Sequence, residues 1–255
     1  MHCPRILQAL LLVLAMALPG CPTRLAEVCP RCVEVSPEHL LLLPADIERI
    51  YVLVPGILGY GWEWNGVQIL LGRLPRTAVV VAEWDPWGSL ASGAERVRAA
   101  VQRLLRHRPP QTHEVVLIGH SVGGLVLALA ASRLQVPQGV RVRALTVGAP
   151  FAGTRFSLVE YEGSLRSPSP LGISGVFRRW PPPAPGVQLE VYPTTWPSDP
   201  LMRPRMGYDP GRLDVLPPGA RLHALPPGMD HNLAVVWIAE RLAREVHGTR
   251  TEKGS

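Results

Sequence analysis

The stretch that decides the fold is Glu114-Val-Val-Leu-Ile-Gly-His-Ser-Val-Gly-Gly-Leu125, in which a β-branched apolar run leads into the pattern Gly119-x-Ser121-x-Gly123. The apolar run predicts a buried strand, and the spacing of the apolar residues at 125–134 predicts a helix just after it. A strand that turns at once into a helix strains the backbone at the serine, and the two glycines remove side chains that would collide there. The sequence therefore predicts a nucleophile elbow, which holds Ser121 at the sheet edge and at the positive end of the helix.

Outward from this turn, strand patterns and helix patterns alternate along the chain. Buried strands are predicted at 47–54, 77–82, 140–147, 187–192 and 221–225, and helices at 67–74, 94–107 and 232–246. Parallel neighbouring strands need long right-handed crossovers, which these intervals supply. With 255 residues, 47% of them hydrophobic, the chain can build one α/β domain with a doubly wound, mainly parallel sheet.

The N-terminus predicts export from the cytoplasm. Arg5 precedes an apolar run over residues 6–18 that is too short to span a bilayer. One interpretation is a small-x-small cleavage site at 15–17 and plain secretion. The other is a lipobox-like segment at 18–21, in which Cys21 becomes a lipidated N-terminus and anchors a cell-envelope lipoprotein in the membrane. Pro19 is unusual inside a lipobox.

The cysteines favour the lipoprotein. Cleavage after Ala17 would leave an odd number of cysteines in an oxidising compartment, whereas lipidation of Cys21 leaves the pair Cys29 and Cys32, which could close a short disulfide. No further Cys or His pattern indicates a metal site. The formal net charge of +6 is spread over scattered arginines without a basic run, so we expect no nucleic-acid binding.

Composition shifts divide the chain into segments. We predict a signal peptide at 1–20, a linker at 21–45, the α/β domain at 46–247 and a tail at 248–255. Residues 151–186 break into Ser, Arg, Gly and Pro and end in a Pro-rich run. A loop of this length in a compact domain is usually functional, so we predict a small cap over the site, with a surface insertion as the alternative.

A serine hydroxyl needs a base to take its proton and an acid to orient that base. The expected chain order is Ser, then Asp or Glu, then His. His231 lies between the last strand and the last helix, which makes it the best base for Ser121. Asp199, in the loop after the strand at 187–192, is the predicted acid, with Asp214 and Asp209 as alternatives.

A tetrahedral intermediate would need two backbone donors for its oxyanion. We expect these to be the N–H groups of Val122, directly after the serine, and of Ile57, in the glycine-rich loop after the strand at 47–54. Six of the seven tryptophans fall in predicted loops near these strand ends, which indicates an apolar cleft. Trp62, Trp64 and Trp196 are the predicted substrate contacts, although a core position is the alternative for each tryptophan.

Three segments resemble the α/β-hydrolase superfamily, and within it the bacterial lipase and esterase branch and related deacylases. Val52-Leu-Val-Pro-Gly-Ile-Leu-Gly59 is similar to its oxyanion segment, Leu117-Ile-Gly-His-Ser-Val-Gly-Gly-Leu125 to its elbow, and Leu145-Thr-Val-Gly-Ala-Pro-Phe-Ala-Gly-Thr154 to the strand and loop that follow. Two positions depart from the usual pattern, because Pro55 and Phe151 stand where the branch often has histidine. Neither departure removes a member of the predicted triad.

The resemblance implies an α/β-hydrolase fold and hydrolysis of carboxylic esters through an acyl-serine intermediate, without a cofactor. A lipid or other long-chain ester would suit the tryptophans and a membrane anchor. Two alternatives stay open: an acyltransferase that uses the same triad, and a lipoprotein that binds a ligand without catalysis.

Overall fold

The computed structural model describes residues 32–33, 43–56, 62–86, 88–151, 180–194 and 216–251. Within these residues seven strands form one sheet in the order β1-β3-β2-β4-β5-β6-β7, and every neighbouring pair runs parallel. The strands are β1 (Cys32–Val33), β2 (Arg49–Val54), β3 (Thr77–Val81), β4 (Glu114–His120), β5 (Arg141–Val147), β6 (Val187–Tyr192) and β7 (Arg221–Leu222).

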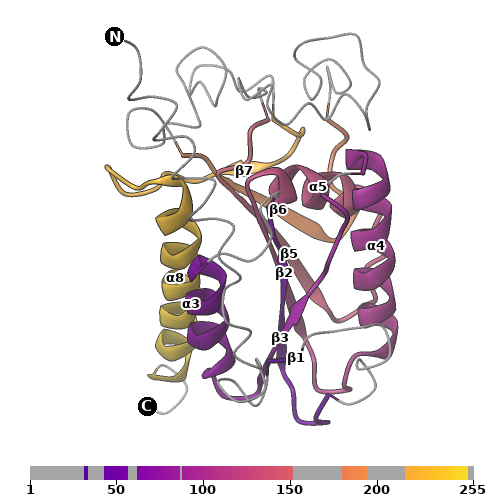
Figure 1. Ribbon diagram of the computed structural model, residues 1–255. Helices are drawn as coiled ribbons and strands as arrows, with labels where there is room; N and C mark the ends of the chain where they lie inside the picture. The colour runs from indigo at the N-terminus through magenta and orange to yellow at the C-terminus, as the bar shows by residue number, and fades with distance from the viewer. Residues whose placement is uncertain are drawn as a thin grey trace, which may run out of the picture.

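Four helices cover the two faces of this sheet in the described part of the chain. They are α3 (Trp62–Gly72), α4 (Leu90–His107), α5 (Val122–Ala131) and α8 (His231–Thr251). Helices α3 and α8 lie on one face, and α4 and α5 lie on the other (Figure 1). This arrangement confirms the predicted doubly wound α/β fold.

The central strands are buried on both faces, which explains their nearly continuous apolar sequences. In β2, Ile50 and Val52 pack against α4 and α5, whereas Tyr51 and Leu53 pack under α3 and α8. Successive side chains of a strand point to opposite faces, so one strand feeds two separate cores. The sheet is thereby held in the middle of the domain, with its carboxyl edge free to carry loops.

The predicted elements differ from the observed ones mainly at their ends. Helix α3 starts at Trp62, five residues before the predicted start, and α8 runs on to Thr251. Strand β1 was not predicted: it has only two residues and forms only two register pairs with β3, so no alternation marks it in the sequence. Three sequence predictions fall outside the described residues. They are the signal peptide, the cysteine Cys29 that was expected to pair with Cys32, and residues 152–179 of the cap.

The last residues of the predicted cap segment belong to the core. Trp180 is buried and packs edge to face on Phe151, with ring centroids 5.0 Å apart. The backbone N–H of Ala184 donates to the carbonyl of Ala131 at the end of α5. Residues 180–186 therefore form part of the domain body and lead directly into β6.

Helix α5 packs unusually closely on the loop after β2. A Cβ atom on Gly123 would lie only 2.2 Å from the carbonyl oxygen of Pro55 and 2.5 Å from that of Val54. Both neighbours are backbone atoms, so they cannot move aside as a flexible side chain would. The first turn of α5 thus requires glycine at this position.

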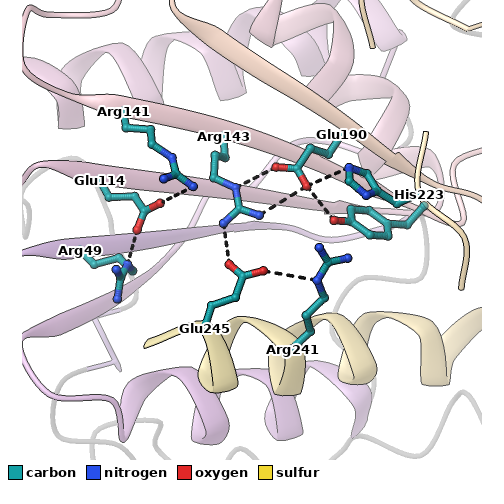
Figure 2. Close-up of polar contacts among 9 residues, drawn as sticks. Arg49, Glu114, Arg141, Arg143, Glu190, His223, Arg241 and Glu245 are labelled. Carbon is teal, nitrogen blue, oxygen red and sulfur yellow. Dashed lines mark hydrogen bonds and ion pairs between the residues drawn. The ribbon is translucent and has the colours of Figure 1, made fainter. Parts of the chain in front are cut away.

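Arg143 joins α8 to the sheet, because it binds both Glu190 and Glu245 (Figure 2). Arg143 on β5 donates to Glu190 on β6 at 2.8 Å and to Glu245 on α8 at 2.9 Å, and Tyr192 Oη donates to Glu190 at 2.7 Å. The side chains of Arg143 and Glu190 are only 7% and 6% exposed. Burial raises the pKa of Glu190, but the hydrogen bonds from Arg143 and Tyr192 outweigh it and hold that pKa below its ordinary value.

We predict that Gly123→Ala lowers the free energy of unfolding by more than about 3 kcal/mol, because the new methyl group overlaps backbone oxygen atoms. Chemical denaturation measures the change. Gly66→Ala is the matched control, since a Cβ there meets nothing within 4 Å inside α3. The control should gain about 0.5–1 kcal/mol. Equal effects of the two substitutions would contradict the close contact.

We also predict that Glu190→Gln lowers stability at neutral pH by about 3 kcal/mol, because it leaves buried Arg143 with Glu245 as its remaining carboxylate partner. The pKa of Glu190 is lowered in the folded state, so its stabilisation is complete above the unfolded pKa and is lost as pH falls through the folded pKa. The variant should therefore lose less stability on acidification than the wild type. Denaturation curves from pH 7 to pH 3 test this.

Glu240→Gln serves as the control for the acid dependence. The Glu240 side chain is 49% exposed and lies 3.7 Å from Arg244 in an exposed pair on α8, so its removal should change stability by less than about 0.5 kcal/mol. If Glu190→Gln and wild type lost stability equally between pH 7 and pH 3, the buried carboxylate would not be the source of the acid sensitivity.

Candidate functional site

Ser121 occupies the turn between β4 and α5 with a strained backbone. Its φ is 54° and its ψ is −131°, and Arg76 is the only other non-glycine residue with positive φ in the described residues. Such a conformation costs on the order of 1–3 kcal/mol and persists only where surrounding packing enforces it. The N–H of Ser121 donates to the carbonyl of Val147 at the end of β5, at 2.9 Å. The predicted strained turn is thus confirmed, with Ser121 half-buried at the carboxyl edge of the sheet.

The loop after β2 passes directly beside this serine. A Cβ atom on Gly56 would lie 3.1 Å from Cβ and 3.7 Å from Oγ of Ser121. Trp84 fixes the loop, because its Nε1–H donates to the carbonyl of Pro55 at 2.8 Å. Val122 opens α5, where the first N–H groups of a helix have no acceptor within it. Of the two predicted oxyanion donors, Val122 therefore lies beside the serine, and Ile57 lies outside the described residues.

His231 is the first residue of α8 and is buried at the same edge of the sheet. A Cβ atom on Gly148, just after β5, would lie 3.0 Å from its Nδ1 and 3.3 Å from Oγ1 of Thr194, just after β6. The Nδ1 side of the imidazole therefore faces the segments that follow β5 and β6. The segment after β6 continues along the chain toward Asp199, the predicted acid.

Two contacts hold the start of α8. Asp230 caps the helix, because its Oδ1 accepts from the N–H groups of Asn232 and Leu233 at 2.9 Å and 2.7 Å. His120 lies against His231, with ring centroids 4.6 Å apart, and its Nε2 is 2.9 Å from the carbonyl oxygen of His231. Since a carbonyl only accepts, Nε2 of His120 must carry the hydrogen. The residue before Ser121 thus ties the backbone of His231 to the end of β4.

This role of His120 was not foreseen, since the sequence placed it only as the variable position of the elbow. A signal existed in the alternation of β4. His120 falls on the same side of the strand as Val116 and Ile118, which pack under α3 and α8. The side chain therefore had to point toward the helix that carries His231.

The predicted acids Asp199, Asp214 and Asp209 all lie outside the described residues, so Asp199 stays a prediction. Asp230 is taken up by the cap of α8. His223 follows β7, stacks on Tyr192 with ring centroids 4.8 Å apart and pairs with Glu190 at 3.3 Å.

The structure places Trp64 in the core and not on the wall of a cleft. It is 0% exposed and meets the ring of His120 edge to face, with centroids 6.1 Å apart. The reason is the early start of α3, which turns this residue toward the sheet. Trp84 and Trp180 are also core residues. Trp196 and the side chain of Trp62 lie outside the part of the chain that the structure describes. Their substrate contacts therefore remain predictions.

The described residues contain no group of three His, Cys, Asp or Glu side chains arranged to hold a metal ion. None of their helices combines the length and the apolar character that crossing a membrane requires.

Comparison with known proteins places this geometry in a family. The model of the alpha/beta hydrolase family matches residues 13–252. Esterase 2 of Thermogutta terrifontis, phosphoramylated by tabun, superposes with a TM-score of 0.51 at 16% identity, over 85% of this chain and 87% of that one. Its apo form gives a TM-score of 0.50 at 16% identity, with the same coverage.

A lipase-esterase related protein from Clostridium acetobutylicum is similar at a TM-score of 0.43 and 12% identity, over 80% of this chain and 96% of the other. No match is found among the curated proteins. The likeness to esterase 2 shows a shared fold. The family match covers most of the chain, including β4, Ser121 and His231. The chain therefore belongs to the alpha/beta hydrolase family.

Proposed function

We propose that this chain is a serine hydrolase that cleaves carboxylic esters through an acyl-serine intermediate. The observation that carries the proposal is the strained backbone of Ser121, held between β4 and α5 beside the loop after β2. Strain of this kind persists where packing enforces it, and it presents the hydroxyl at the edge of the sheet. Membership of the alpha/beta hydrolase family supports a hydrolase in general.

In the proposed reaction His231 takes the proton of Ser121 Oγ as the oxygen attacks the ester carbonyl. The N–H groups of Val122 and Ile57 stabilise the oxyanion that forms. The tetrahedral intermediate collapses, and His231 gives its proton to the departing alcohol. His231 then takes a proton from water, whose oxygen attacks the acyl-serine. The second tetrahedral intermediate breaks its bond to Ser121 Oγ, and His231 returns the proton to this oxygen as the carboxylic acid leaves. Asp199 holds the imidazole through Nδ1, which faces the segments after β5 and β6.

Three tryptophans of the described residues lie in the core and do not line a cleft. Because Trp64, Trp84 and Trp180 are core residues, an apolar cleft would depend on Trp62, Trp196 and the predicted cap. We propose an apolar, lipid-type ester, in keeping with the export and the lipidation of Cys21 that the sequence predicts. The similar esterase 2 of Thermogutta terrifontis reacts with the organophosphorus compound tabun, which recommends a phosphorus electrophile as the probe.

We predict that a fluorophosphonate labels the purified protein and that Ser121→Ala abolishes both the label and the hydrolysis of p-nitrophenyl esters, with a loss in kcat of at least about 10⁴-fold. Ser132→Ala is the matched control: this hydroxyl, at the other end of α5, donates to the carbonyl of Leu129. The control should keep the label and the turnover. The preferred acyl length then separates a short-chain esterase from a lipase. Absence of label on folded wild type would instead favour a ligand-binding protein.

We predict that Asp199→Asn lowers kcat by about 10⁴-fold, because an amide at this position favours the wrong tautomer of His231. Asp214→Asn and Asp209→Asn should leave kcat within about threefold of wild type, since these residues would play no part in proton transfer. Steady-state kinetics on one p-nitrophenyl ester decides between the three. A collapse of kcat in Asp214→Asn with Asp199→Asn unaffected would move the acid to Asp214.

A further inference from the structure

A second concentration of charged side chains lies between the sheet and α8, from the first residues of β2, β4 and β5 across to β6 and β7 (Figure 2). Two adjoining hollows lie there, of about 370 Å³ and 460 Å³, and Arg141, Arg143 and Glu245 line both. The charged residues that line them are five arginines and three glutamates: Arg49, Arg141, Arg143, Arg221, Arg241, Glu114, Glu190 and Glu245. No step of the proposed reaction uses any of these residues.

The charges in this region do not balance. Five arginines face three carboxylates, which leaves two positive charges uncompensated. His223 adds little charge at neutral pH, because burial lowers its pKa against the opposing effect of Glu190. A site that carries a surplus of two cationic charges attracts an anion of matching charge.

The carboxylates are already occupied within the protein. Glu114 lies between Arg49 and Arg141, Glu245 lies between Arg143 and Arg241, and Glu190 accepts from Arg143 and Tyr192. These three carboxylates are therefore not available to neutralise a further arginine of the larger hollow.

Three arginines of the larger hollow keep donors to spare. Arg141 is 61% exposed and meets Glu114 through Nη2 at 3.3 Å. Arg221 meets the side-chain oxygen of Gln188 at 2.6 Å and 3.2 Å when that amide is turned toward it. Arg241 reaches Glu245 through Nε at 3.3 Å. A guanidinium has five N–H donors, so each of these groups can still bind oxygen atoms.

The heads of Arg241 and Arg143 are also held in place. The guanidinium of Arg241 lies over the ring of Tyr192, 5.5 Å from its centroid, and His223 stacks on the same ring at 12°. Arg143 is 7% exposed and bound on two sides. Groups that are fixed before a ligand arrives lose little conformational entropy when it binds.

We propose that the larger hollow, between β5, β6, β7 and α8, binds a phosphate group through Arg141, Arg221 and Arg241. A phosphate carries a charge close to the surplus, and its several oxygens match the paired donors of guanidinium groups. The group can belong to a soluble phosphate compound or to the headgroup of an anionic lipid. The site is separate from Ser121, so phosphate binding can be tested independently of the proposed hydrolase activity.

The test is calorimetric titration of the purified protein with inorganic phosphate at pH 7, with ionic strength held constant by sodium chloride. We expect saturable binding to wild type and at least about tenfold weaker binding to the double variant Arg141→Gln/Arg221→Gln, because two charge-assisted contacts are lost. The matched control is Arg96→Gln/Arg106→Gln, which removes the same charge from exposed positions on α4, on the other face of the sheet. This control should bind phosphate like wild type.

Arg221→Gln alone provides a second measurement if the double variant unfolds, since Gln188 is the side-chain contact of Arg221. We expect it to weaken phosphate binding several-fold. Absence of saturable binding to wild type, or equal weakening in the α4 control, would overturn the proposal and leave only a general effect of charge.

Vesicles distinguish the two sources of the phosphate group. Sedimentation with phosphatidylcholine vesicles that contain phosphatidic acid is compared with pure phosphatidylcholine, so that any apolar N-terminal binding cancels. Extra binding that inorganic phosphate displaces and Arg141→Gln/Arg221→Gln lacks would assign the site to a lipid headgroup. Saturable binding of free phosphate without extra vesicle binding would assign it to a soluble compound.

Discussion

The close approach of α5 to the loop after β2 is the constraint on which the site depends. There is no room for even one methyl group between Gly123 and the carbonyl of Pro55. With α5 pressed against this loop, the chain between β4 and α5 has a single residue in which to reverse direction, and Ser121 takes a positive φ. The same approach brings Gly56 beside the serine and the first N–H groups of α5 to one point. The positive φ of Ser121 and its nearness to the loop after β2 are therefore consequences of one packing contact.

Helix α8 begins with His231, the base of the proposed reaction, and it is held at both ends. At its start Asp230 caps the helix and His120 binds the carbonyl of His231. Near its end Glu245 accepts from Arg143, which is itself bound to Glu190 on β6. A helix fixed at two distant points cannot tilt or slide on the sheet, so the imidazole keeps its place relative to Ser121. These buried polar contacts thus fix the position of α8 on the sheet.

The two edges of the sheet carry different chemistry for a common physical reason. Parallel strands place all their carboxyl ends at one edge and all their amino ends at the other. Ser121, His231 and the loops after β5 and β6 gather at the first edge. Arg49, Glu114 and Arg141, each the first residue of its strand, gather at the second. One topology thus creates two separate clusters of polar side chains.

The sequence by itself determined the α/β fold, the order of the strands along the chain, the turn at Ser121 and the place of His231 at the start of the last helix. These features rest on local periodicity and on chain order, which a reader of the sequence can follow directly. The acid Asp199 was predicted by the same chain-order argument, but its loop lies outside the described residues.

Only the tertiary structure decided the features that depend on contacts between elements far apart in the sequence. It turned Trp64 into the core, because α3 starts earlier than its apolar spacing indicated. It gave His120 a role that spans 111 positions of the chain, and it paired Arg143 with Glu245 across 102. It added β1, a strand too short to show a pattern of its own. Contacts between such distant residues leave no local periodicity in a single sequence, because each partner satisfies its own element equally well without the other.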